Sequence, residues 1–305
     1  MRFYSLHKKV LIAFLALSLL PLGVLGFYAA RNLSSVEQYL RKSASSALEA
    51  QATRSLVLSA QTVADTVSIF LRSIENDLNS FVLLEAEEAE YMDFYNRHRG
   101  TMRIWENGSE KLSDVPLYSE LAFVDPDGTE RIRIVDGVPV DELRNVSVPA
   151  NTTYKTEDYF RRTLELPDGM VYVSRVSGWF IHRNEVEEKG HDTQYKGVVR
   201  FARAVYNSDG SLRGVAVISL DHLHLMEFTR HISPDGKDSS KKASYESADY
   251  SFMFDDEGWI ITHPKQWDIR GYNKDGTLTG TRGEYNARRL QEGDIPFNLF
   301  NCYSN

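Results

Sequence analysis

Two arginines separated by one residue give this sequence its clearest potential for binding chemistry. Arg131 and Arg133 fall on alternate positions of a predicted strand, and alternate side chains of a strand point to the same face. A guanidinium can hold a carboxylate or a phosphate through two parallel hydrogen bonds, and aromatic side chains can wall a small pocket around it. The pair indicates a site for a small anion, unless both arginines only cover the solvent face of a half-buried strand.

Histidines and carboxylates gather after residue 220 in a pattern that could bind a metal ion. His224, Glu227 and His231 are spaced to share one helical face, and Asp221 and His222 precede them. A polar helix face without a metal is the simpler interpretation, and we adopt it. The sequence therefore predicts no metal and no cofactor.

The other acidic pairs do not form a catalytic constellation. Asp125 and Asp127, like Asp255 and Asp256, lie in predicted turns, where aspartate favours the local backbone geometry. The sequence contains no nucleophile elbow, no phosphate-binding loop and no HExxH zinc motif. We expect the residues present to bind a ligand rather than to catalyse a reaction.

The amino-acid composition also limits which classes of partner this chain can bind. The net charge is -8 over 305 residues and no basic cluster stands out, so nucleic acid is excluded as a partner. Cys302 is the only cysteine, which rules out a disulfide within the chain and a cysteine metal cage. For an exported domain, this fits a bacterial envelope.

An uncharged and mostly apolar segment at residues 10–30 predicts a membrane anchor, because about twenty residues of helix span a bilayer. The basic tail before it, residues 1–9, predicts a cytoplasmic N-terminus. A cleaved signal peptide is the alternative, but its apolar region is shorter, and Tyr28 occupies a place where a cut after Ala30 needs a small residue. We expect a single-pass protein of the bacterial inner membrane, with its modules outside the cytoplasm.

Residues 31–99 contain no Gly or Pro and are predicted to form a long stalk helix. Apolar or small residues recur there at spacings of three and four, which places them on one helical face. This stripe consists of Leu56, Ala60, Val63, Val67, Phe70, Ile74, Leu78, Phe81 and Leu84. We expect it to pack on the domain that follows and to lose regularity before Gly100. A weaker stripe at 33–50 could pair with a second copy, so a homodimer is expected.

Beyond Gly100 the apolar period becomes that of strands, and one hairpin occurs twice. Strands at 121–124 and 131–135 flank the turn 125–128, and strands at 250–254 and 259–262 flank the turn 255–258. Between the hairpins we predict helices at 158–166 and 221–231, the second capped by Asp221, and strands at 170–176, 196–206 and 212–220. The repeated hairpin predicts two similar modules in tandem.

In this order, the segments resemble a double Cache sensor domain, the extracytoplasmic ligand-binding module of bacterial histidine kinases, chemoreceptors and cyclic-dinucleotide enzymes. The first module carries the resemblance in FVDPDG at 123–128, DYF at 158–160, VYVS at 171–174, FARAVY at 201–206, DG at 209–210 and GVAV at 214–217. The second module carries it in DEGWIITHP at 256–264. The resemblance covers the chain from the anchor to about residue 275.

The resemblance implies an α+β fold with an N-terminal transmembrane helix, a stalk helix and two tandem PAS-like modules built on antiparallel sheets. The expected parts are a cytoplasmic tail at 1–9, the anchor at 10–30, the stalk at 31–99, a membrane-distal module at 100–232, a linker at 233–248 and a membrane-proximal module at 249–305. We expect the second module to be incomplete, because such modules need further strands and an exit helix.

Two departures from the family pattern bear on the ligand. Amino-acid-binding members carry an arginine two positions before the aromatic pair, where this chain has Glu157, and an aspartate near the position of Ser174. Those groups would bind the carboxylate and the ammonium of an amino acid. Their replacement argues against an α-amino acid. Residues 179–194 resemble a charged insertion that could act as a lid.

In such a module the short helix and the inner sheet face line the ligand pocket. The predicted ligand-binding residues are Arg131, Arg133, Tyr154, Asp158, Tyr159, Tyr172, Ser174, Trp179, Arg203 and Asp221. Tyrosines placed as Tyr159 and Tyr172 are more often core residues than ligand contacts. Arg200 and Arg203, three positions apart, must point to opposite faces of their strand, and we expect Arg203 to face the ligand.

These patterns predict a sensor that binds a small molecule in its membrane-distal module and passes a signal across the membrane as part of a histidine kinase. A chemoreceptor or a cyclic-dinucleotide enzyme is the alternative within this class. An exported enzyme, or a structural envelope protein on a coiled-coil stalk, is the alternative from another class.

Overall fold

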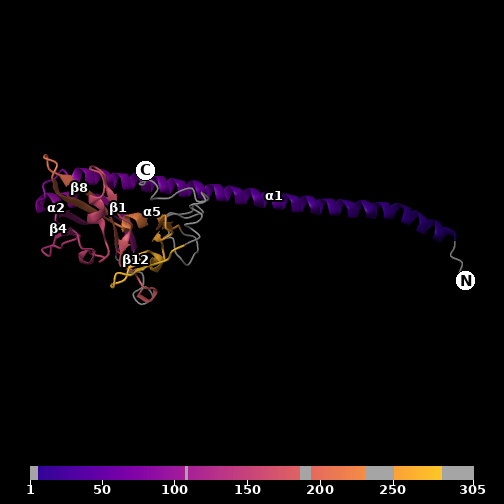
Figure 1. The fold of residues 1–305 in the computed structure, drawn as a ribbon. Coiled ribbons are helices and arrows are strands. Elements are labelled where there is room, and N and C mark those ends of the chain that lie inside the picture. The colour runs from indigo at the N-terminus through magenta and orange to yellow at the C-terminus, as the bar shows by residue number, and fades with distance from the viewer. Residues whose placement is uncertain (1–5, 107–108, 186–193, 231–250, 284–305) are drawn as a thin grey trace. The chain divides into compact units, whose positions relative to one another are not determined.

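The computed structural model describes residues 6–106, 109–185, 194–230 and 251–283, and the chain forms two compact units, residues 1–59 and 60–305 (Figure 1). The structure is α+β with antiparallel sheets, as the sequence predicts. The predicted linker at 233–248 and the chain after residue 283 lie outside the described residues.

The described part of the first unit belongs to one helix. α1 begins at Leu6 and ends at Phe81, so it continues into the second unit. The apolar side chains of the segment 10–30 are exposed, with Leu17 77% and Leu22 69% accessible. Among the described residues, α1 is the one helix that is long and apolar enough to cross a membrane, by length and composition. The predicted anchor lies within it.

The last turns of α1 form one wall of the core of the second unit. Val67, Ile74, Leu78 and Phe81 are fully buried, which confirms the packing predicted for this stripe. Leu56, near its start, is 48% exposed. The stripe therefore contributes to the core from Val63 onward.

The stalk helix predicted over 31–99 is corrected by the structure, because α1 ends at Phe81 and a separate helix, α2 (Glu88–Arg97), follows a turn. Phe81 packs against Tyr91 and Phe94 of α2, with ring centroids 4.3 and 4.8 Å apart. Burial of these rings favours a chain that folds back on the end of its own helix.

A seven-stranded antiparallel sheet forms the centre of the second unit, with the strand order β5-β4-β3-β9-β8-β6 and β7 also paired to β8. The strands are β3 (Tyr118–Val124), β4 (Glu130–Val135), β5 (Val138–Pro139), β6 (Tyr172–Val173), β7 (Ser177–Gly178), β8 (Gly197–Tyr206) and β9 (Leu212–Asp221). The strands predicted at 121–124, 131–135, 196–206 and 212–220 are confirmed. Of the strand predicted at 170–176, only β6 forms.

Both faces of the sheet are covered. Phe201 of β8 belongs to the core cluster that contains the buried α1 residues. Its neighbour Ala202 lies on the opposite face with Tyr159 and Phe160 of α3 (Tyr159–Leu164). Neighbouring strand residues point to opposite sides, so the sheet separates an α1 side from an α3 side. Helix α3 confirms the short helix predicted at 158–166.

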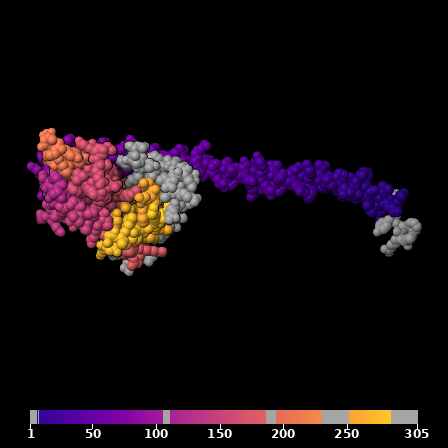
Figure 2. All heavy atoms as spheres, viewed as in Figure 1, coloured from indigo at the N-terminus to yellow at the C-terminus, as the bar shows by residue number. Residues whose placement is uncertain are grey.

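The second module is a small set of hairpins that packs beside the first (Figure 2). β10 (Met253–Phe254) pairs with β11 (Ile260–Thr262), and β12 (Gly271–Tyr272) pairs with β13 (Leu278–Thr279), with the 3₁₀ turn Gln266–Asp268 between them. Gly258 has φ 85° and Gly128 has φ 87°, a left-handed conformation that glycine adopts at little cost. The repeated hairpin predicted from the sequence is therefore present at both places.

Two further elements complete the first module. α5 (Leu223–Arg230) follows β9, and the Asp221 carboxylate accepts the Leu223 N–H at 2.9 Å at its start, as predicted. The hairpin of β1 (Arg99–Glu106) and β2 (Ser109–Pro116) is not predicted by the sequence. A short 3₁₀ turn at Pro149–Asn151 precedes α3.

Candidate functional site

A cavity of about 560 Å³ lies between the start of α3, the β6–β7 segment and the second module. Its size and its mixture of aromatic and polar side chains suit a small molecule. The lining residues are Thr156, Glu157, Asp158, Tyr159, Arg162, Tyr172, Val173, Ser174, Arg175, Ser177, Asp256, Arg270 and Tyr272. None of them is a histidine or a cysteine, so the described cavity offers no thiol or imidazole nucleophile.

A buried charge cluster adjoins the cavity through Glu157. The guanidinium of Arg200, 1% exposed, donates to both carboxylate oxygens of Glu157 and to Glu120 Oε1 at 2.9 Å. Arg133 donates to Glu120 Oε2 at 3.3 Å and lies 3.7 Å from Glu130. Charges this deeply buried persist only when they are paired. The α3 side of the sheet therefore holds an ionic network of three carboxylates and two arginines.

The pKa directions within this network follow from burial and from the arginines. Burial alone would raise the pKa of Glu120, but Arg200 and then Arg133 outweigh it and hold this pKa below its ordinary value. For Glu130, burial dominates and raises the pKa, because its arginine partner is farther away and Glu120 is a like charge. Glu120 is therefore the ionised centre of the cluster.

Aromatic rings form much of the cavity wall. The Arg200 guanidinium lies over the Tyr159 ring, 5.0 Å from its centroid, a cation–π contact that fixes both groups. Tyr172 is half-buried; burial first, and then the neighbouring Asp158, raise the pKa of its hydroxyl to about 12. Both hydroxyls are neutral at physiological pH and can donate hydrogen bonds to a ligand.

Three consecutive residues of the β6–β7 segment connect the cavity wall to β8 and to the second module. The Ser174 hydroxyl accepts the Arg200 N–H at 2.8 Å. Arg175 binds the acidic turn of the second module, with its Nη1 2.8 Å from Asp255 Oδ2 and 2.6 Å from Asp256 Oδ1. The Val176 carbonyl accepts a hydrogen bond from Arg270 at 2.5 Å. The cavity is thus built from both modules.

The predicted ligand-binding residues divide into two groups in the structure. Asp158, Tyr159, Tyr172 and Ser174 line the cavity. The others lie elsewhere; they are Arg131, Arg133, Tyr154, Trp179, Arg203 and Asp221. Tyr154 and Trp179 form an edge-to-face pair, 5.3 Å between ring centroids, that packs beside Tyr272 without reaching the cavity surface.

Arg131 and Arg133 do not act as a pair. The register of β3 and β4 shifts between Phe123 and Val124, so Arg131 has no partner in the register, whereas Arg133 lies opposite Ala122. Arg133 is buried with Glu120, whereas the Arg131 side chain is 49% exposed and bound to Asp125 at 2.5 Å. The bulge separates two side chains that simple alternation places together.

Arg203 lies on the face opposite to the one predicted. Its Nη1 donates to Asn79 Oδ1 of α1 at 2.6 Å, on the α1 side of the sheet, while Arg200 takes the α3 side. The prediction that the two arginines diverge is confirmed. The assignment of Arg203 to the cavity side is corrected, because α1 covers its face.

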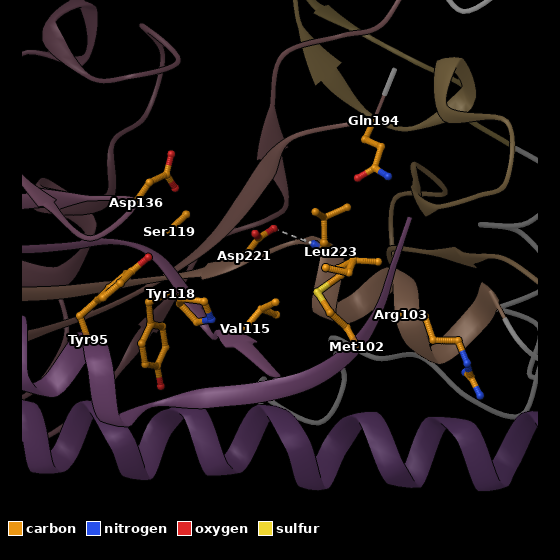
Figure 3. Close-up of a pocket in the computed structure, with 12 residues that line it drawn as sticks. Tyr95, Met102, Arg103, Val115, Tyr118, Ser119, Asp136, Gln194, Asp221 and Leu223 are labelled. Atoms are coloured by element: carbon orange, nitrogen blue, oxygen red, sulfur yellow. Dashed lines mark hydrogen bonds between the residues drawn. The ribbon is translucent and has the colours of Figure 1, made fainter. Parts of the chain in front are cut away.

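Asp221 lines a separate pocket of about 300 Å³ between the β1–β2 hairpin and the sheet. Figure 3 shows its carboxylate bonded to the Leu223 N–H, with Asp136, Ser119 and Tyr95 along the same wall. Burial raises the pKa of Asp221. This pocket shares no lining residue with the larger cavity.

The side chains considered as metal ligands after residue 220 contact other groups instead. His224 Nε2 bonds to the Pro116 carbonyl at 2.9 Å, and Glu227 pairs with Arg103 at 3.3 Å. His231 lies outside the described residues. Among the described residues, no group of three or more His, Cys, Asp or Glu side chains could hold a metal ion.

Several cavity residues escape the sequence analysis. Arg162, Arg175 and Arg270 line the cavity without being predicted. The buried ion pair of Arg200 could have been predicted, because Arg200 interrupts the apolar run Val198 to Ala202, and a charge inside a buried strand requires a buried partner. No sequence pattern predicts the position of Arg270, since it depends on how the second module packs.

Comparisons with protein-family models and with curated proteins find no match for this chain. Among solved structures, it is similar to the extracellular domain of a protein assigned as a histidine kinase, vpHK1S-Z8, at 14% identity, covering 72% of this chain and 71% of that one, with a TM-score of 0.40. It is also similar to the sensory domain of the Campylobacter jejuni chemoreceptor Tlp3 with isoleucine bound, at 15% identity, covering 72% of each chain, with a TM-score of 0.39. A third is the ligand-binding domain of the Pseudomonas aeruginosa amino-acid chemoreceptor PctC with GABA, at 15% identity, covering 70% and 73%, with a TM-score of 0.39.

Proposed function

We propose that this chain is the sensor part of a membrane-anchored bacterial signal-transduction receptor, and that it binds a small molecule in the cavity of about 560 Å³. The cavity carries the proposal, since its walls combine aromatic rings, hydroxyls and charged groups in the mixture typical of ligand sites. The ordered Cache-like motifs support the same class, and the histidine kinase is the output we propose.

The anchor and the stalk give the proposed sensor a route for signalling. Residues 10–30 cross the membrane, the modules lie outside the cytoplasm, and a homodimer pairs through the stalk. Ligand binding stabilises one of two packings of the modules and so shifts a pre-existing equilibrium. The proposal assigns no catalytic step to these residues, because the cavity lining contains no nucleophile with an adjacent base.

A thermal-shift screen tests the proposal. The full chain in detergent, screened with small metabolites and followed by tryptophan fluorescence, is expected to be stabilised by at least one compound. Tyr172→Ala removes a cavity wall and is expected to abolish that shift. Tyr206→Ala is the matched control, because Tyr206 is 37% exposed at the end of β8. Stabilisation that persists in Tyr172→Ala, or no stabilisation by any compound, contradicts the proposal.

A further inference from the structure

Three carboxylates and three arginines line the cavity, but two of these arginines have no carboxylate partner among the described residues. Three carboxylates line it, and each is bound to an arginine: Glu157 to Arg200, Asp158 to Arg161 at 3.0 Å and Asp256 to Arg175 at 2.6 Å. Of the three lining arginines, Arg175 is bound to the acidic turn. Arg162 and Arg270 have no carboxylate within 4 Å among the described residues.

Arg270 is the more informative of these two cations. It is 7% exposed, and its guanidinium donates to the Val176 carbonyl at 2.5 Å and to the Tyr272 hydroxyl at 3.3 Å. Its Nε is buried and has no hydrogen-bond partner. Both of its acceptors are neutral, and the guanidinium lies over the Tyr272 ring, 5.7 Å from its centroid. Its charge partly offsets the rise that burial causes in the pKa of Asp255, but no carboxylate of the described residues forms an ion pair with it within 4 Å. A buried guanidinium in this state is costly, and an anion beside it removes the cost.

Arg162 lies on α3, at the other side of the cavity. Its side chain is exposed and makes no hydrogen bond or ion pair with a described residue. Its neighbour Arg161, in contrast, is bound to Asp158 at 3.0 Å and to Glu165 at 2.5 Å. The two unmatched cations therefore come from different modules and line the same cavity.

We propose that the cavity binds a ligand with an oxyanion group, a carboxylate or a phosphate, held by Arg270 of the second module and Arg162 of α3. This inference rests on the proposed function and adds the ligand class. Planar guanidinium groups match either oxyanion. The ligand carries no ammonium group, because every lining carboxylate already has an arginine partner. By binding to both arginines, the ligand joins the two modules.

Thermal shift and calorimetric titration of the full chain in detergent test this proposal. The probes are inorganic phosphate, succinate, L-aspartate and uncharged succinamide, each added at the ionic strength of a sodium chloride reference. Phosphate or succinate is expected to raise the midpoint of unfolding above that reference, and succinamide is not. Succinate and aspartate differ by one ammonium group, so aspartate is expected to bind at least 10-fold more weakly than succinate.

Variants locate the effect. Arg270→Gln and Arg162→Gln are each expected to weaken anion binding about 10- to 100-fold, the range for a lost charge-assisted hydrogen bond. Arg213→Gln is the control, because Arg213 pairs with Glu85 at the surface and neither residue lines the cavity, and this variant is expected to bind as the parent does. If Arg270→Gln does not fold, Arg162→Gln, at an exposed position, carries the test.

The outcomes separate the two proposals. Anion binding that is unchanged in Arg162→Gln, or a screen in which only neutral or cationic compounds bind and depend on Tyr172, overturns the oxyanion proposal and leaves the sensor proposal intact. The absence of binding by any compound of any charge overturns both. Selective binding of phosphate over succinate, or the reverse, identifies the oxyanion.

Discussion

Replacing Arg200 by methionine is expected to destabilise the second unit by about 3–5 kcal/mol, the cost of removing one partner from a buried ion pair. Arg200 is 1% exposed and binds both Glu120 and Glu157, which are 6% and 8% exposed. Methionine fills much of the same volume, so the loss comes from the two carboxylates that remain without this partner.

The loss depends on pH in a direction set by Glu120. In the parent, burial would raise the pKa of Glu120, but the arginines hold it below 4.5, so this carboxylate stabilises the folded chain above that pH and the contribution disappears as the pH falls through the lowered value. Without Arg200, burial raises the pKa, and the folded variant takes up a proton more readily. The difference in unfolding free energy is therefore expected to be largest at neutral pH. It shrinks as the pH falls through the raised pKa of Glu120 in the variant, above 4.5, and stops changing below the lowered pKa of Glu120 in the parent.

Urea unfolding of the full chain in detergent, followed by tryptophan fluorescence at several pH values, measures this difference. The control is Arg213→Met, since Arg213 pairs with Glu85 at the surface, where Glu85 is 73% exposed, and such pairs contribute below about 1 kcal/mol. A loss in Arg200→Met no larger than in the control, or a loss that is independent of pH, refutes the buried network.

Two further predictions concern the core and the topology. Phe81→Ala is expected to cost about 3–5 kcal/mol of unfolding free energy, because Phe81 is fully buried between α1 and α2. Leu83→Ala, at a side chain that is 81% exposed, is expected to change this free energy by less than about 0.5 kcal/mol. Equal losses in the two variants contradict the packing of Phe81. Protease added to intact spheroplasts is expected to digest the modules and spare a short fragment that contains residues 10–30, and full protection of the modules contradicts the proposed orientation.

The sequence predicts the central strands well because local signals suffice for them. β3 and β4 flank a turn in which Gly128 takes a positive φ, and β9 carries a continuous apolar run. For the β1–β2 hairpin the sequence offers only a turn signal, the dipeptide Asn107-Gly108, since the residues on either side of it are mostly polar. The end of α1 at Phe81 depends on aromatic contacts with α2, which the helical period does not encode.

The site is less predictable than the fold, because it depends on which element covers each face of the sheet. The alternation rule correctly separates Arg200 from Arg203, but it cannot tell that α1 covers the face of Arg203. The register shift between β3 and β4 breaks the pairing of Arg131 with Arg133. Arg270 reaches the cavity only through the contact between modules, which follows from tertiary packing and not from local sequence.

The three residues Ser174, Arg175 and Val176 constrain how this sequence can diverge. Each one meets a different partner: the backbone of Arg200, the acidic turn at 255–257, and the guanidinium of Arg270. A homologue that replaces Arg175 must also change the charge of a turn about eighty positions later in the chain, or lose the contact. Substitutions here are therefore expected to occur as coordinated sets, and an alignment of related chains would reveal the junction between the modules as covariation between 175 and 255–257.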